Sequence, residues 1–291
     1  MKKIISFFLL FFISVLAFSQ GKIVESLSIK SRVLGKEVRY SIYLPSDYET
    51  SQRKYPVLYL LHGYSDDETG WVQFGEVQKI ANETIAKGDA TQMIIAIPDA
   101  GVSWYINDAR GKVRYEDFFV NEFIPYVDSV YRTRTNKQYR AVAGLSMGGY
   151  GSLIYAMKHP NLFSACAPLS AAIWNDDHIV EMTEEAWRNY KFNELFGTEL
   201  SGKNRLTETW NKNSIFKLAA IVAVDQLSQV RFYIDCGDDD SLVKGNMDLH
   251  AILMDRKVKH EFRIRNGAHN WPYWRSALPE VLKFVSESFH R

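Results

Sequence analysis

One serine, Ser146, stands among closely spaced glycines in the stretch AVAGLSMGGYGSLIYAMKHP (Ala141–Pro160). The apolar run before it predicts a buried strand, and the residues after it predict a helix that ends before Pro160. Gly144 and Gly148 complete the pattern G-x-S-x-G. A serine at such a strand-to-helix turn acts as a nucleophile, and the glycines let neighbouring backbone approach it. A tight packing corner made of small residues is the alternative interpretation.

A serine hydroxyl needs a base to remove its proton and a third group to orient that base. His269 follows the last predicted strand in the loop NGAHNWPYW, where the base is expected in the chain order Ser, acid, His. His260 precedes that strand, so we expect it at the opposite edge of the sheet and at the surface. The acid is expected in the loop GDDDSL after the preceding strand, which offers Asp238, Asp239 and Asp240, with Asp235 inside the strand as a weaker candidate.

The negative oxygen that forms when a serine attacks a carbonyl needs two backbone N–H donors. The Met147 amide, next to the nucleophile, is one expected donor. The second is expected from Gly63 or Tyr64, in the loop after the apolar run YLLHG. His62 in the same loop is expected to shape the turn, because no second base is needed.

Short apolar runs alternate with helical patterns along the chain. Strands are expected at Val38–Leu44, Pro56–Gly63, Met93–Asp99, Arg140–Ser146, Phe163–Ser170, Val230–Gly237 and His260–Gly267. Helices are expected at Glu76–Lys87, Tyr115–Tyr131, Met147–His159, Leu242–Arg256 and Arg275–Phe289. This alternation predicts an α/β fold, with a mostly parallel central sheet, helices on both faces and functional loops at the carboxyl ends of the strands. Residues 171–229 break the rhythm and are interpreted as an irregular helical insertion near the active face.

The first 19 residues have the layout of a secretory signal peptide. Lys2 and Lys3 precede an apolar run of 15 residues, Ile4–Phe18, and small residues precede an expected cleavage site before Gln20. The run is shorter than the roughly 20 apolar residues that span a membrane, so no stable membrane insertion is expected after cleavage. Residues 20–291 then form one secreted or periplasmic domain.

The charge of the chain points to a substrate that is neither nucleic acid nor an anionic membrane surface. There are 35 basic and 34 acidic residues, and residues 1–19 contribute two lysines and no acidic residue. The exported protein is therefore close to neutral. The two cysteines, Cys166 and Cys236, stand in apolar strand patterns, so buried free thiols are favoured over one disulfide. No spacing typical of metal ligands is present, and no cofactor is expected.

Four segments together resemble one known group of enzymes. YPVLYLLHGYSDDETGW, GLSMGGYGSL, CGDDDSL and GAHNWPYWRSAL are similar to the esterase D-type putative esterases of the α/β-hydrolase superfamily. This group includes feruloyl and acetylxylan esterases, tributyrin-type esterases, S-formylglutathione hydrolases and mycolyltransferases. The resemblance runs from about Ser26 to the C-terminus and implies an α/β-hydrolase fold. The family's acid stands as G-x-x-D, which selects Asp240, and its G-x-H-x-W-x-x-W pattern falls on His269.

In one respect the chain departs from this family. Its carbohydrate esterases often carry several glycines after H-G, whereas Tyr64 and Ser65 stand there in this chain, so the second oxyanion donor stays open between Gly63 and Tyr64. Aromatic rings suit sugar faces and cinnamoyl groups. The residues expected to line the substrate site are Trp71, Trp104, Tyr105, Trp271 and Trp274.

These observations together predict a secreted serine carboxylesterase that uses Ser146, His269 and Asp240. The expected substrates are small-molecule or oligosaccharide esters, with feruloyl or acetyl groups on plant cell-wall xylan preferred. An acyltransferase with a sugar acceptor and a general short-chain esterase are the alternatives. A non-catalytic carbohydrate-binding descendant is disfavoured because all three positions hold the required residue types.

Overall fold

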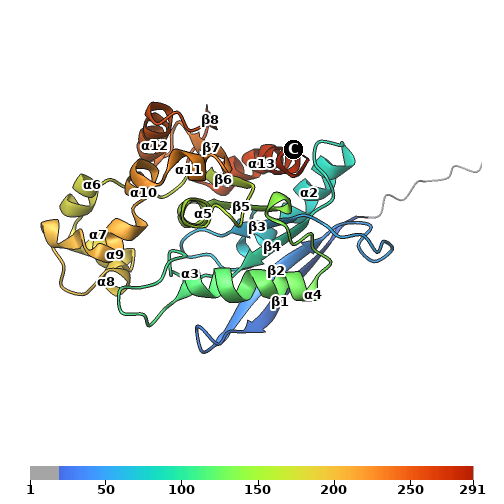
Figure 1. The fold of residues 1–291 in the computed structure, drawn as a ribbon, viewed down its shortest axis with the longest axis horizontal. Coiled ribbons are helices and arrows are strands. Elements are labelled where there is room, and N and C mark those ends of the chain that lie inside the picture. Colours follow the sequence, from blue (N-terminus) through green and yellow to red (C-terminus); the bar gives the residue numbers. More distant parts are fainter. Residues whose placement is uncertain (1–19, 291) are drawn as a thin grey trace, which may run out of the picture.

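The structure, a computed structural model, describes residues 20–290 (Figure 1). The predicted signal peptide, residues 1–19, lies outside the described residues. Within residues 20–290, eight strands form one sheet in the order β1-β2-β4-β3-β5-β6-β7-β8. The strands are β1 (Lys22–Lys30), β2 (Glu37–Leu44), β3 (Val57–Leu61), β4 (Ile94–Pro98), β5 (Arg140–Leu145), β6 (Ala165–Leu169), β7 (Arg231–Gly237) and β8 (His260–Arg265).

Helices connect and cover these strands. Those outside the predicted insertion are α1 (Gly70–Gln73), α2 (Val77–Ala86), α3 (Tyr115–Phe118), η1 (Phe119–Phe123), α4 (Ile124–Val130), η2 (Lys137–Tyr139), α5 (Met147–Lys158), α12 (Val243–Asp255) and α13 (Trp271–Phe289). Those inside residues 171–229 are α6 (Asp176–Glu181), α7 (Glu184–Asn189), α8 (Phe192–Leu195), η3 (Gly202–Arg205), α9 (Glu208–Asn213), α10 (Ile215–Ile221) and α11 (Val224–Leu227). This segment is thus a series of short helices.

The central strands are buried on both faces. Every residue of β3, β4, β5 and β6 is buried, which explains their nearly continuous apolar sequences. One face packs against α2 and α13, and the other packs against α3, η1, α4, α5 and α12 (Figure 1). The predicted α/β class, a mostly parallel sheet with helices on both faces, is confirmed.

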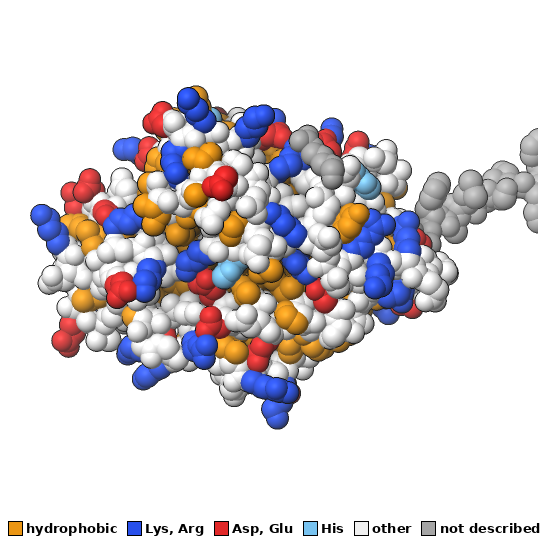
Figure 2. All heavy atoms as spheres, in the orientation of Figure 1, with side chains coloured by type: hydrophobic (Ala, Val, Ile, Leu, Met, Phe, Trp, Pro, Cys, Tyr) orange, Lys and Arg blue, Asp and Glu red, His pale blue; other side chains and the backbone are white. Residues whose placement is uncertain are grey.

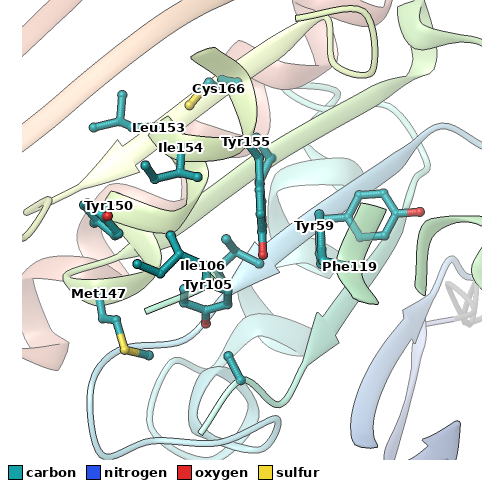
Figure 3. Close-up of a cluster of buried hydrophobic side chains, with 14 of the residues drawn as sticks. Tyr59, Tyr105, Ile106, Phe119, Met147, Tyr150, Leu153, Ile154, Tyr155 and Cys166 are labelled. Carbon is teal, nitrogen blue, oxygen red and sulfur yellow. The ribbon is translucent and has the colours of Figure 1, made fainter. Parts of the chain in front are cut away.

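Aromatic packing fixes the helix that follows Ser146. Figure 3 shows buried side chains of this helix, α5, together with those that pack against it. The ring of Tyr155 on α5 stacks on Phe119 of η1 at 4.2 Å with an interplanar angle of 4°. Tyr59 on β3 meets Phe119 edge-on at 5.4 Å. Such ring pairs add about 0.5–1.5 kcal/mol each beyond the burial of their surface. Helix α5 is therefore anchored through Phe119 to strand β3 of the sheet.

The strand directions place the predicted functional loops at one edge. β3, β5, β6, β7 and β8 run parallel to one another, whereas β1 and β2 pair antiparallel at one side of the sheet. The loops after β3, β5, β7 and β8 consequently leave from the same edge, the usual place for a site in a sheet of this kind. They carry Tyr64, Ser146, Asp240 and His269, respectively.

Basic and acidic side chains are interspersed over the face shown in Figure 2, in keeping with the nearly balanced composition. None of the helices between residues 20 and 290 has the length and apolar character needed to span a membrane.

Candidate active site

Ser146 lies in the one-residue turn between β5 and α5. Its φ of 54° and ψ of −115° place it in a region that residues with a side chain rarely adopt. The surrounding backbone holds it there, since its amide donates to Leu169 O at 2.9 Å and its carbonyl accepts from Tyr150 and Ala172 at 3.0 Å. Strain of this kind persists where neighbouring structure enforces it, and it lifts the hydroxyl out of the sheet.

The flanking glycines make room for this turn. A Cβ on Gly148 would lie 2.5 Å from the carbonyl oxygen of Leu61 and 2.6 Å from that of His62. A Cβ on Gly144 would lie 2.5 Å from the carbonyl oxygen of Gly148. Helix α5 can therefore start directly against the end of β3 only when both positions are glycine. This close approach brings the loop after β3 next to Ser146.

His269 connects Ser146 to Asp240. Its Nε2 lies 3.0 Å from Ser146 Oγ, and its Nδ1 lies 2.8 Å from Asp240 Oδ2. Burial by itself raises the pKa of Asp240, but hydrogen bonds from His269, the Leu242 amide and Ser170 outweigh burial and leave this pKa below its ordinary value. The carboxylate is thus ionised at neutral pH and accepts a hydrogen bond from Nδ1–H. Nε2 is then free to accept the serine proton.

The other acidic candidates have different partners. Asp238 Oδ1 accepts from the Gly267 amide at 2.9 Å, and Asp239 is exposed. Asp235 is fully buried and receives hydrogen bonds from Tyr233, Tyr273 and Arg265. Asp240 is the aspartate of this group that contacts His269.

The two other histidines considered above, His260 and His62, are hydrogen-bonded to partners other than Ser146. His260 pairs with His250 at the start of β8, with 2.7 Å between Nε2 and Nδ1, at the opposite edge from His269. His62 is fully buried, and its Nε2 accepts from the Ala100 amide at 2.8 Å. Its Nδ1 must therefore carry the proton that it donates to Gly63 O, also at 2.8 Å. Burial lowers the pKa of His62, in keeping with a neutral ring that shapes the turn.

The predicted backbone donors lie next to Ser146 or line the same pocket. Met147 is the first residue of α5, where an N–H has no carbonyl partner within the helix. Gly63 and Tyr64 line the same pocket as Ser146. The Gly63 backbone amide donates a hydrogen bond to the Asp66 carboxylate, and this bond lowers the pKa of Asp66 against the larger effect of burial. Because Gly63 is engaged in this way, Tyr64 is the better candidate for the second donor.

Ser146 and His269 open into a pocket of about 370 Å³. Among the predicted lining residues, Trp104, Trp271 and Trp274 contribute to its wall. The volume lies within the range of sites for small organic ligands, which is about 300–1,000 Å³.

Two predicted lining residues lie behind the pocket, and this part of the prediction is wrong. Trp71 is fully buried, and its indole N–H donates to Leu61 O at 2.9 Å. Tyr105 is also fully buried, and its hydroxyl donates to His62 O at 2.9 Å. Both rings therefore support the end of β3 from within, as buried aromatic residues with a polar group usually do.

Two pocket residues that the sequence did not single out come from the helical insertion. Trp174 and Tyr190 line the pocket, and the indole N–H of Trp104 donates to Tyr190 O at 2.9 Å. The Trp104 and Trp174 rings lie 5.5 Å apart. The high Trp content of residues 171–229 was the available signal, but it did not identify which rings turn towards the serine.

No group of three or more His, Cys, Asp or Glu side chains is close enough to hold a metal ion in the part of the chain that the structure describes. Cys166 and Cys236 are both buried free thiols, as predicted.

The chain is similar to known proteins in both sequence and structure. The model of a family described as "Putative esterase" matches residues 31–285. A solved structure of a ferulic acid esterase is similar with a TM-score of 0.80 and 34% identity, covering 93% of this chain and 99% of that one. An acetyl esterase of Caldicellulosiruptor saccharolyticus is 24% identical over 276 residues, or 91% of this chain and 98% of the relative.

A third relative is a diacylglycerol acyltransferase/mycolyltransferase of Mycobacterium gordonae. It is 26% identical over 298 residues, covering 89% of this chain and 79% of the relative. The structural likeness to the ferulic acid esterase extends over nearly the whole of both chains, and the predicted α/β-hydrolase fold is confirmed.

Proposed function

The chain belongs to the putative esterase family, and from this premise we propose that it is a secreted serine carboxylesterase acting on feruloyl or acetyl esters of plant cell-wall xylan or its oligosaccharides. The observation that carries the proposal is the position of His269, within hydrogen-bonding distance of both Ser146 Oγ and Asp240 Oδ2.

The reaction has two stages. Ser146 Oγ attacks the ester carbonyl carbon while His269 Nε2 takes the hydroxyl proton, and Asp240 holds the imidazole in the required tautomer. The amides of Met147 and Tyr64 donate hydrogen bonds to the oxyanion. His269 then gives its proton to the alcohol oxygen, which leaves as the acyl-enzyme forms. Water, deprotonated by His269, then attacks the acyl carbon, and His269 returns this proton to Ser146 Oγ as the acyl bond breaks and the acid is released.

Aromatic side chains support a substrate with an aromatic acid or a sugar. Trp104, Trp174 and Tyr190 form one side of the pocket, with Trp271 and Trp274 beside His269. Flat rings of this kind suit a cinnamoyl ring and the C–H faces of sugars. The similarity to a ferulic acid esterase and to an acetyl esterase supports the same two acyl groups.

Export is part of the proposal and rests on residues 1–19 alone. Cleavage before Gln20 would release residues 20–291. Secretion is tested by N-terminal sequencing of the protein recovered outside the cytoplasm. A chain recovered intact with Met1 would contradict it.

The direct test of the activity is hydrolysis of a short panel by the mature protein and by Ser146→Ala. The panel contains 4-nitrophenyl acetate, 4-nitrophenyl butyrate, methyl ferulate and acetylated xylo-oligosaccharide. Release of ferulate or xylan acetate that disappears in Ser146→Ala supports the proposed substrates. Serine-dependent turnover of the nitrophenyl esters alone would instead favour a general short-chain esterase.

An acyltransferase is the second candidate, favoured by the similarity to the mycobacterial acyltransferase over 89% of the chain. In that case a sugar hydroxyl replaces water in the second stage. Product analysis with added xylo-oligosaccharide separates the two, because transfer yields a new sugar ester whereas hydrolysis yields free acid.

A further inference from the structure

A row of aromatic rings leads from the candidate base to the surface. Trp274 meets the imidazole of His269 edge-on at 4.9 Å, and Trp271 meets Trp274 edge-on at 5.3 Å. Phe74 follows, with its ring centroid 6.0 Å from that of Trp271. Exposure rises along the row, from 6% at Trp274 to 51% at Phe74. Phe74, which is exposed, and Trp271, which is half-buried and lines the pocket, together form an apolar platform open to solvent.

The local backbone holds this platform in place. A Cβ on Gly75 would lie 2.9 Å from the Trp271 ring, so glycine at this position lets the ring lie against the chain. Arg275 on α13 donates to Phe74 O at 3.0 Å and lies 3.5 Å from the carboxylate of Glu76. Phe74 is thereby tied to the helix that carries Trp271.

A carboxyl group lies on the wall of the same pocket. Asp66 lines it together with Ser146, His269 and Trp271. Burial and the neighbouring Asp67 raise the pKa of Asp66 to about 6. Its carboxylate is an acceptor for hydroxyl groups. The rings of Trp271 and Phe74 suit the apolar C–H face of a sugar, and the Asp66 carboxylate suits one of its hydroxyl groups.

The position of the leaving alcohol in the proposed reaction indicates which part of the substrate contacts this platform. In the proposed reaction His269 returns its proton to the leaving alcohol oxygen, so the alcohol must lie beside Nε2. Trp274 and Trp271 continue outward from this imidazole. Trp104 and Trp174 belong to the other group of rings, which contacts Tyr190 and Phe192.

We propose that Phe74, Trp271 and Asp66 bind the sugar that carries the alcohol oxygen of the ester. This inference rests on the proposed function and adds to it the residues that select a sugar as the leaving group. The apolar face of the sugar stacks on Trp271 and Phe74, and Asp66 accepts a hydrogen bond from a hydroxyl.

The test compares two esters of one acid, with and without a sugar. Methyl ferulate and a feruloylated xylo-oligosaccharide serve as the pair, or 4-nitrophenyl acetate and acetylated xylo-oligosaccharide if acetyl is the acyl group that is cleaved. The quantity measured is kcat/KM for the sugar ester divided by kcat/KM for the simple ester. Phe74→Ala should lower this ratio about 2- to 10-fold, the range expected for one lost ring contact. Asp66→Asn should lower it about tenfold, the loss of a hydrogen bond to a charged group.

Met254→Ala is the matched control, because Met254 is an apolar side chain on α12 with 59% exposure. Its ratio should equal that of the wild type. An unchanged ratio in both Phe74→Ala and Asp66→Asn overturns this inference while leaving the esterase proposal intact. A wild type that cleaves neither ester overturns the proposed function itself.

Discussion

Arg265 donates two hydrogen bonds to the buried carboxylate of Asp235. Its Nε and Nη2 each lie 3.1 Å from a different carboxylate oxygen. The hydroxyls of Tyr233 and Tyr273 donate to the same carboxylate. Asp235 and Tyr233 belong to β7, Arg265 ends β8, and Tyr273 lies in the first turn of α13. The loop with His269 runs from Arg265 to α13, so this one carboxylate fixes both ends of the loop.

Asp235→Ala should therefore reduce both stability and activity. The substitution leaves the guanidinium and two buried hydroxyls without their acceptor, which is expected to cost about 3 kcal/mol of unfolding free energy. Urea unfolding measures this loss, and kcat of the folded protein should fall because His269 is less well positioned. Asp239→Ala, an exposed aspartate of the neighbouring turn, is the control and should change stability by less than about 0.5 kcal/mol. Equal stability of the two variants would argue against the role of the carboxylate.

Asp240→Asn should abolish most of the catalysis without unfolding the protein. An amide can offer N–H to His269 Nδ1, which favours the tautomer with its proton on Nε2, where it cannot accept the serine proton. A loss in kcat of about 10³- to 10⁴-fold is expected. Asp238→Asn provides the comparison, because Asp238 contacts the Gly267 amide instead of the imidazole. If Asp238→Asn were the more damaging change, the proposed acid would be misassigned.

Gly148→Ala should reduce both stability and kcat, because the added Cβ would displace neighbouring backbone. The added Cβ meets the carbonyl oxygens of Leu61, which ends β3, and of His62, the next residue, and these backbone atoms cannot rotate away as a side chain can. We expect a loss of about 1–3 kcal/mol in stability, together with a lower kcat, because the Tyr64 amide moves relative to Ser146. Gly88→Ala is the control: its φ of 78° makes alanine strained, but nothing lies within 4 Å of the new Cβ. Thermal unfolding and kcat, measured on both, should show reduced activity for Gly148→Ala alone.

The elements around the site could be predicted because their signals are local. The strand before Ser146 and the helix after it were expected at Arg140–Ser146 and Met147–His159, and they are observed at Arg140–Leu145 and Met147–Lys158. Strand β1 was missed. Most of its residues lie exposed or half-exposed at the edge of the sheet, and the register shifts between Val24 and Leu27, so no clean alternation remains.

Other errors have equally specific causes. Helix α13 was expected from Arg275 but begins at Trp271, because Asn270 caps it and Pro272 is tolerated in a first turn. Trp71 and Tyr105 stand near the right loops in sequence, yet the direction of each ring depends on carbonyl groups of β3 and its loop. Long-range contacts of this kind have no periodic signal in the chain.

The two cysteines should be inert in the folded protein. Burial raises the pKa of both thiols, that of Cys236 to about 12, so the reactive thiolate is scarce at pH 8. A disulfide-exchange reagent at this pH should give no colour with native protein and should titrate two thiols in guanidinium chloride. A denatured protein that yields no thiol would mean that the cysteines are joined as a disulfide.

Asp66→Asn should stabilise the protein more at pH 7.5 than at pH 4.5. Burial first, and then the charge of Asp67, raises the pKa of Asp66 from 3.8 to about 6 in the folded state. Between these values the folded protein keeps a proton that the unfolded chain has lost, so the wild type loses stability as pH rises through this window. Asparagine does not titrate and avoids this loss. The melting temperature of Asp66→Asn minus that of the wild type should therefore grow across the window, with Asp239→Asn as the control for removal of one negative charge. A difference that shrinks with pH would mean that the folded protein favours the ionised carboxylate, and Asp66 would then be charged at the pH of the native site.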